Sequence, residues 1–156
     1  MSMATGLRRF LDDTHLPYEI VHHKHAESSQ RRASAAHLPG SQMAKSVLLK
    51  DDQGYLLAVL PSNRRVHLGQ LHRSMHRNLG LATEHEAAEL FRDCKLGAFP
   101  PTGLLYDVDT LVDDNLLDQD DIYFEAGDHQ QTVHMSRKNF GRLVGDAEHS
   151  QFSYPV

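Results

Sequence analysis

Residues 43–60, MAKSVLLKDDQGYLLAVL, contain two apolar segments separated by a short polar stretch. Residues 45–50 and 55–60 are rich in valine, leucine and other apolar residues, a composition that favours β-strands. The intervening Asp51-Asp52-Gln53-Gly54 is typical of a hairpin loop, and Gly54 can adopt a positive φ there. The stretch therefore predicts a hairpin of two apolar strands.

The sequence before this hairpin predicts two helices and one strand. Residues 6–14 place their apolar side chains on one helical face, and residues 18–21 alternate as a strand does. Ser28 or Ser29 can cap a second helix that runs to about Leu38, where Pro39-Gly40 ends it.

The sequence after the hairpin predicts a loop over 61–65 and a helix over 68–79, whose leucines and methionine share one face. Thr83, with Glu86 three residues later, forms a capping box for a helix that runs to about residue 93. Residues 97–103, GAFPPTG, suit neither a helix nor a central strand. Residues 104–112, 122–126 and 132–135 are expected to be extended, and Ser136 caps a last helix through about 144.

Strands and helices alternate, but hairpins interrupt them, which indicates one mixed sheet with helices packed on it. We therefore expect an α/β (mixed α+β) fold in a single domain over residues 1–146. Residues 147–156 are expected to form a C-terminal tail.

The composition and the net charge of the chain exclude some classes of function. The chain has 156 residues, 40% of them hydrophobic, and a net charge of −5, which argues against a protein that coats nucleic acid. The charge is uneven: residues 1–78 carry +5 and residues 79–156 carry −10. A local basic surface can form from Lys24, Arg31, Arg32, Arg64, Arg65, Arg73 and Arg77. An equally good interpretation is that the acidic half simply keeps the protein soluble.

The single cysteine, Cys94, excludes an intrachain disulfide and a cysteine-based zinc cluster. The apolar runs are far shorter than the roughly 20 residues that span a bilayer. Residues 1–15 lack the apolar core of a secretory signal. We therefore expect a cytoplasmic protein with no membrane partner.

Twelve histidines raise the question of a metal site. His72 and His76 are four residues apart on an expected helix and can chelate together, but the glutamate of an HExxH motif is missing and Arg73 and Arg77 would repel a cation. His22 and His23 point to opposite faces of a strand. Surface histidines are the favoured interpretation, so no metal or other cofactor is expected.

Three further features of the sequence could take part in a reaction or in binding. Cys94 could act as a nucleophile, although a half-buried apolar role is the favoured interpretation. Lys45 opens an apolar strand, where it is either a charged residue that protects a strand edge or a cation held at a cleft. The rigid loop over 97–103 can present backbone groups to a water or an oxyanion.

Several segments of the sequence, taken in their order along the chain, resemble the YbaK family, the prolyl-tRNA-synthetase-associated editing domains. The resemblance covers about residues 18–144. It rests on YEIVHH at 18–23, MAKSV at 43–47, GYLLAVLP at 54–61, GAFPPTG at 97–103 and YFEAGDH at 123–129. Each segment alone is a weak signal, and their common order carries the resemblance. It implies a curved, mixed and mainly antiparallel sheet flanked by helices.

The resemblance also implies an aminoacyl-tRNA deacylase without a cofactor. Its catalytic residues would be Lys45, Gly97 and His129, of which Lys45 would support the reaction electrostatically and the Gly97 backbone would position a water or the terminal ribose hydroxyl. The substrate would contact other residues of the same segments: Ser46, Ala98, Phe99, Pro100, Pro101, Gly127 and His23.

The partner implied by the resemblance is the acceptor end of a tRNA, above all tRNA for proline, and prolyl-tRNA synthetase is a second expected partner. No synthetase catalytic core fits in 156 residues, so action in trans is expected. Members that remove cysteine carry an aspartate where Thr132 stands here, so the resemblance favours alanine or another small amino acid. The alternative is a binding module of the same fold without turnover, which the net charge of −5 favours.

Overall fold

The hairpin expected from residues 43–60 forms the centre of the larger sheet. The computed structural model describes residues 3–22, 38–95 and 97–156. Strands β2 (Ala44–Asp51) and β3 (Gly54–Pro61) pair antiparallel, with Lys45 opposite Leu60 and Asp51 opposite Gly54. The Asp51 carboxylate accepts hydrogen bonds from the backbone N–H groups of Gln53 and Gly54, and Gly54 has a φ of 136°. The side chain of Asp51 and the glycine thus fix the turn.

Three further strands complete this sheet in the order β5-β2-β3-β6-β9. β5 (Gly80–Leu81) runs antiparallel to β2, while β6 (Asp109–Asp113) and β9 (Glu148–Ser150) run parallel to β3 and to each other. The sheet is therefore mixed. Both faces of β3 are buried, which explains its almost continuous run of apolar residues.

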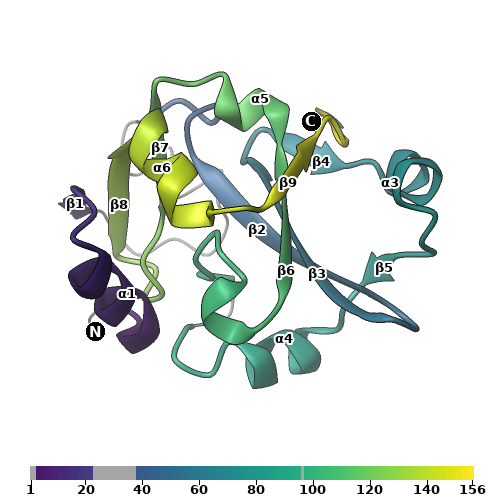
Figure 1. Cartoon of the computed structure of the whole chain (residues 1–156), viewed down its shortest axis with the longest axis horizontal. Coiled ribbons are helices and arrows are strands. Elements are labelled where there is room, and N and C mark those ends of the chain that lie inside the picture. The colour runs from purple at the N-terminus through teal and green to yellow at the C-terminus, as the bar shows by residue number, and fades with distance from the viewer. Residues whose placement is uncertain (1–2, 23–37, 96) are drawn as a thin grey trace.

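A smaller antiparallel sheet lies beside the start of β2 (Figure 1). Its order is β1 (Glu19–His22), β8 (Gln131–Ser136), β7 (Asp121–Glu125). A parallel bridge between Met43 and Tyr123 joins the two sheets, and the Tyr123 N–H donates to the Gln42 carbonyl at 2.9 Å. β4 (Arg64–Val66) and β10 (Ser153–Pro155) form a separate antiparallel pair.

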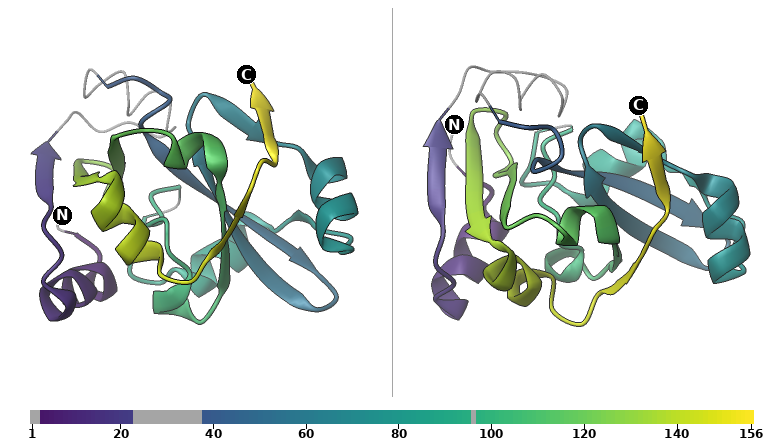
Figure 2. Two further views of the ribbon diagram at one scale, coloured as in Figure 1. Left: turned by 45° about the horizontal axis from the view of Figure 1, so that its top comes forward. Right: turned by 90° about the horizontal axis from the view of Figure 1, so that it is seen from above.

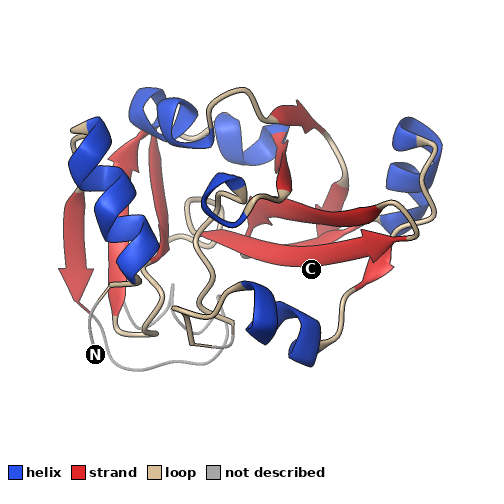
Figure 3. Cartoon of the chain, turned by 60° about the horizontal axis from the view of Figure 1, so that its bottom comes forward, coloured by secondary structure: helices blue, strands red, loops and turns tan. Residues whose placement is uncertain are grey.

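Helices cover the sheets on both sides (Figures 2 and 3). One core cluster combines apolar side chains of α1 (Thr5–Thr14), α6 (Arg137–Val144), the smaller sheet and one face of the larger sheet. A second cluster lies on the other face of the larger sheet, where α3 (Leu68–Met75) contributes Leu71. The remaining helices among the described residues are α4 (Glu84–Leu90), α5 (Asp114–Leu117) and the 3₁₀ turn η1 (Leu104–Tyr106). The expected single α+β domain with a mixed sheet and flanking helices is confirmed.

Several local expectations differ from the structure. The expected loop over 61–65 contains the start of β4, and the expected helix over 68–79 ends at Met75 because His76 adopts a left-handed backbone. That early end lets the chain continue into β5, which pairs with β2. Residues 104–112 are extended only from Asp109, since Gly103 accepts the backbone N–H groups of Tyr106 and Val108 and closes a turn. The helix expected from Ser28 or Ser29 lies outside the described residues.

The last ten residues, expected to be a tail, are ordered parts of the fold. β9 extends the larger sheet and β10 pairs with β4. Between them Phe152 is fully buried, and its backbone carbonyl accepts the N–H of His67 at 2.6 Å. These strands owe their pairing to tertiary neighbours, because their own sequence has no alternating apolar pattern.

We expect Thr83→Ala to destabilise the protein by about 1 kcal/mol. The Thr83 hydroxyl accepts the Glu86 N–H at 3.1 Å, and the Glu86 carboxylate accepts the Thr83 N–H at 2.9 Å, so the expected capping box of α4 is confirmed. Urea unfolding measures the loss. Thr5→Ala is the matched control, since exposed Thr5 begins α1 and caps nothing. Equal losses in both variants would contradict the capping role.

Candidate active site

Lys45 lies near the start of β2, partly buried and close to a second cation. Its pKa is lowered from the ordinary lysine value, first by burial of the ammonium group and second by the positive charge of Arg65. Arg65 is an exposed residue of β4, the strand that follows β3. Two neighbouring cations create a positive potential that attracts anions such as phosphate. Lys45 and Arg65 thus place two cations near the start of β2.

The loop over 97–103 is irregular, as expected, and closely packed. Gly97 has a φ of 82°, a conformation that suits glycine. Ala98, Pro100 and Pro101 are buried. The Phe99 ring stacks on Phe91 of the neighbouring chain segment with a centroid distance of 4.4 Å. The loop thus holds its backbone groups in fixed directions.

Two hydrogen bonds connect this loop region with the other expected site segments. The Ser46 hydroxyl donates to the Pro100 carbonyl at 3.1 Å, which ties the loop to β2. The Lys95 N–H, just before the loop, donates to the Gly127 carbonyl at 2.8 Å. The structure therefore brings together β2, the loop and the β7–β8 turn, which are far apart in the sequence.

The β7–β8 turn contains the expected Gly127 and His129, both with positive φ values of 107° and 63°. The Asp128 carboxylate stabilises the turn by accepting the N–H groups of Gln130 at 3.0 Å and Gln131 at 2.9 Å. The side chain of His129 is almost completely buried. The turn also contacts α1, because Ala4 donates its N–H to the Ala126 carbonyl.

Further polar groups are buried beside this turn, among them Glu125, which the sequence did not single out. Thr132 of β8 is the register partner of Glu125 of β7, and both side chains are buried. Among the described residues, the Thr132 hydroxyl and one oxygen of Asp128 have no hydrogen-bond partner. A glutamate within the apolar segment 122–126 was the available sequence signal. These groups give the interior beside the turn a polar character.

Lys45 and Ser46 leave β2 on opposite faces, because neighbouring side chains alternate along a strand. Ser46 shares its face with Leu48 and reaches the loop, whereas Lys45 shares its face with Val47 and lies near Arg65. The cation and the loop therefore flank the start of β2 from two sides. His23, the remaining expected contact, lies outside the described residues.

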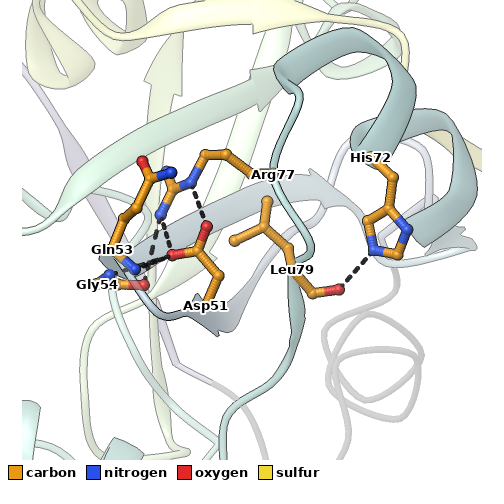
Figure 4. A network of polar contacts seen from close by, with 6 residues as sticks. All are labelled: Asp51, Gln53, Gly54, His72, Arg77 and Leu79. Atoms are coloured by element: carbon orange, nitrogen blue, oxygen red, sulfur yellow. Dashed lines mark hydrogen bonds and ion pairs between the residues drawn. The ribbon is translucent and has the colours of Figure 1, made fainter.

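The other chemical candidates from the sequence lie in environments that do not suit their proposed roles. Burial raises the pKa of Cys94 to about 12, so its thiol stays protonated near neutral pH and is a poor nucleophile. His72 donates through Nε2 to the Leu79 carbonyl at 2.8 Å (Figure 4). His76 lies beyond the end of α3. The expectation that both histidines lie on one helix is wrong, because α3 ends at Met75.

Arg77, which is expected to be part of a local basic surface, lies far from Lys45. It forms an ion pair with Asp51 at the far end of β2, about 20 Å from Lys45 by the rise of a strand.

Within residues 3–22, 38–95 and 97–156, no group of three or more histidine, cysteine or acidic residues is arranged to hold a metal ion. Among the same residues, no helix combines the length and hydropathy that a bilayer span requires.

Comparison with known proteins relates the chain to one family. Residues 23–143 match the family model described as "Aminoacyl-tRNA editing domain". Among curated proteins, none matches the chain. A hypothetical protein, APE2540, shares the fold with a TM-score of 0.84 and 18% identity, over 96% of this chain and 99% of that one. A candidate trans-editing enzyme for prolyl tRNA synthetase has a TM-score of 0.81 and 22% identity, over 98% and 99%.

Proposed function

Since the chain belongs to the aminoacyl-tRNA editing domain family, we propose that it hydrolyses the ester bond of a mischarged tRNA and acts in trans. The observation that carries this proposal is the pair of hydrogen bonds from Ser46 to Pro100 and from Lys95 to Gly127, which unites β2, the loop and the turn. The proposed substrate is tRNA for proline that carries alanine or another small amino acid. The similar structure of a candidate trans-editing enzyme supports this choice.

The proposed reaction adds a water to the ester carbonyl and releases the amino acid and the ribose hydroxyl of the terminal nucleotide. An aminoacyl ester is already activated, so positioning of the water matters more than a strong nucleophile. The Gly97 backbone would orient this water or the ribose hydroxyl, and the fixed loop geometry keeps the reorganisation small. His129 would position the substrate from its buried place in the turn.

The positions of the charged residues support separate binding roles for the two sides of β2. Lys45 and Arg65 form the positive side and would hold the phosphates of the terminal nucleotides. The loop would hold the aminoacyl ester, and a pocket formed there by the small Ala98 and the rigid Pro100 and Pro101 would favour a small amino acid. Discrimination against one additional methylene in such a pocket reaches about 1–3 kcal/mol.

A deacylation panel tests the proposal directly. Folded protein is incubated with alanyl-, cysteinyl-, seryl- and prolyl-tRNA for proline, and release of the labelled amino acid is followed. We expect the fastest release from alanyl-tRNA and none above background from prolyl-tRNA. Salt-sensitive binding of the charged tRNAs without release of any amino acid would instead favour the binding module. Absence of both binding and release would refute a tRNA function.

We expect Arg65→Gln to raise KM for the mischarged tRNA roughly threefold to tenfold and to leave kcat almost unchanged. Arg65 is exposed and acts through its charge on a phosphate, which contributes to binding in the ground state and the transition state alike. The dependence of KM on salt should also weaken by about one phosphate contact. Arg142→Gln, an exposed charge on α6, is the control. An equal effect of both variants would mean that only net charge matters.

A further inference from the structure

Two adjoining hollows lie at the end of the larger sheet that is remote from Lys45. Their volumes are about 630 and about 350 Å³, and both are lined by Arg77, Val108 and Asp109. Lys45, Ser46, Gly97 and His129 line neither hollow. The smaller hollow borders the β2–β3 turn at Gln53 and Gly54, about 20 Å along β2 from Lys45. We refer to them together as the distal groove.

The distal groove has an apolar floor. Buried Leu56 of β3 and Leu111 of β6 lie at its base, and partly buried Met75 and Val144 add to its walls. Leu104 stands at its edge with 65% of its surface exposed. A large exposed leucine beside an open apolar floor is unfavourable in water and is typical of a contact surface.

The rim of the distal groove is acidic. Four exposed carboxylates line it, from two separate segments of the chain: Asp107, Asp109, Asp146 and Glu148. Arg77 is the one cation among the described residues that line the groove, and its charge is already neutralised. Its guanidinium donates to both oxygens of Asp51 at 2.7 and 2.8 Å and to the Gly54 carbonyl (Figure 4). Arg77 lowers the pKa of Asp51 to about 2, so that carboxylate stays charged and paired.

These charges decide which class of ligand the groove accepts. A net negative rim repels nucleic acid and anionic metabolites, whereas it attracts cations. The apolar floor and exposed Leu104 require that the ligand also bring apolar side chains. Two hollows on either side of Arg77 suit anchor residues spaced along an extended chain better than one compact molecule.

We propose that the distal groove docks a short basic segment of a protein partner, in which apolar anchor residues alternate with lysine or arginine. The apolar anchors enter the larger hollow, whose lining is mostly apolar, and the cations pair with the carboxylates of the rim and of the smaller, more polar hollow. Because the Lys45 end of β2 is positive and the distal end is negative, the two ends would bind different ligands at the same time. This proposal does not depend on the deacylase function, because its test measures binding alone.

The test is an NMR titration of the full-length ¹⁵N-labelled protein with three probes. The first is a twelve-residue peptide in which leucines are separated by lysine and glycine, and the second has glutamate in place of each lysine. Spermine, a cation without apolar anchors, is the third. We expect only the lysine peptide to shift the amide signals of Arg77, Val108, Asp109 and Glu148 in a saturable way. Shifts centred elsewhere, or equal shifts with spermine, would overturn the proposal.

Variants define the contribution of each part of the groove. We expect Asp109→Asn combined with Glu148→Gln to weaken binding of the lysine peptide roughly threefold to tenfold, since two exposed ion pairs are lost. Leu104→Ser should weaken it by a similar factor through the lost apolar contact. The control removes two exposed carboxylates of α1, Asp12→Asn with Asp13→Asn, and should leave affinity unchanged. Equal weakening by the control pair would overturn the proposal, as would shifts of the groove signals by tRNA.

Discussion

Lys45→Ala is expected to lower kcat/KM for deacylation of the preferred mischarged tRNA by about 10-fold to 100-fold. Lys45 would hold a phosphate from a partly buried position, and the loss of one charge-assisted contact costs about 1.5–3 kcal/mol. Stability should remain equal or rise slightly, because the variant no longer buries an ammonium group beside Arg65. Single-turnover deacylation and urea unfolding of the same preparation give both values.

Lys50→Ala is the matched control for this experiment. Lys50 belongs to the same strand, but it lies near the distal end, where it pairs with Glu86 at 2.6 Å. Its loss should leave kcat/KM within about twofold and cost little stability, since exposed ion pairs contribute about 1 kcal/mol or less. Normal activity of Lys45→Ala, or an equal loss in both variants, would refute the role assigned to Lys45.

Gly127→Ala is expected to destabilise the protein by about 3 kcal/mol or more. Gly127 has a φ of 107°, which a residue with a Cβ rarely adopts, and the strain alone costs about 1–3 kcal/mol. A Cβ at this position would also lie 2.8 Å from the Cβ of Ala4, much closer than normal contact allows. Thermal or urea unfolding measures the total.

Two companion variants separate these causes. Gly145→Ala introduces a Cβ at a positive φ of 61° but meets no atom within 4 Å, so it reports the backbone strain alone. Adding Ala4→Gly to Gly127→Ala removes the colliding methyl group and should restore part of the lost stability. A coupling energy near zero in this double-mutant cycle would exclude the steric contribution.

The parts of the fold that followed from the sequence are those with local signals. The hairpin, the capping box of Thr83 and the Ser136 cap of α6 each depend on residues a few positions apart, and all three are present. β4, β9 and β10 could not be predicted in this way, because they exist only through pairing with distant strands and burial of Phe152.

The candidate site likewise has parts with a local sequence signal and parts that depend on contacts between distant residues. Gly97 and the prolines identify an irregular loop from composition alone, and the family resemblance pointed to Lys45 and His129. The hydrogen bond from Ser46 to Pro100 joins residues 54 positions apart, so no local pattern reveals it. Likewise, the influence of Arg65 on Lys45 depends on where β4 returns after β3.

Lys45 and Ser46 lie on opposite faces of β2, so the β2–β3 turn at the other end of the hairpin determines which of them faces the loop. The two-residue turn between Asp51 and Gly54 sets the pairing of Lys45 with Leu60 at the other end of the hairpin. If β2 slipped by one residue against β3, every side chain of β2 would change sides. The lysine would then face the loop and the serine would face Arg65. Indels in this turn are therefore expected to be far rarer among functional homologues than in ordinary surface hairpins.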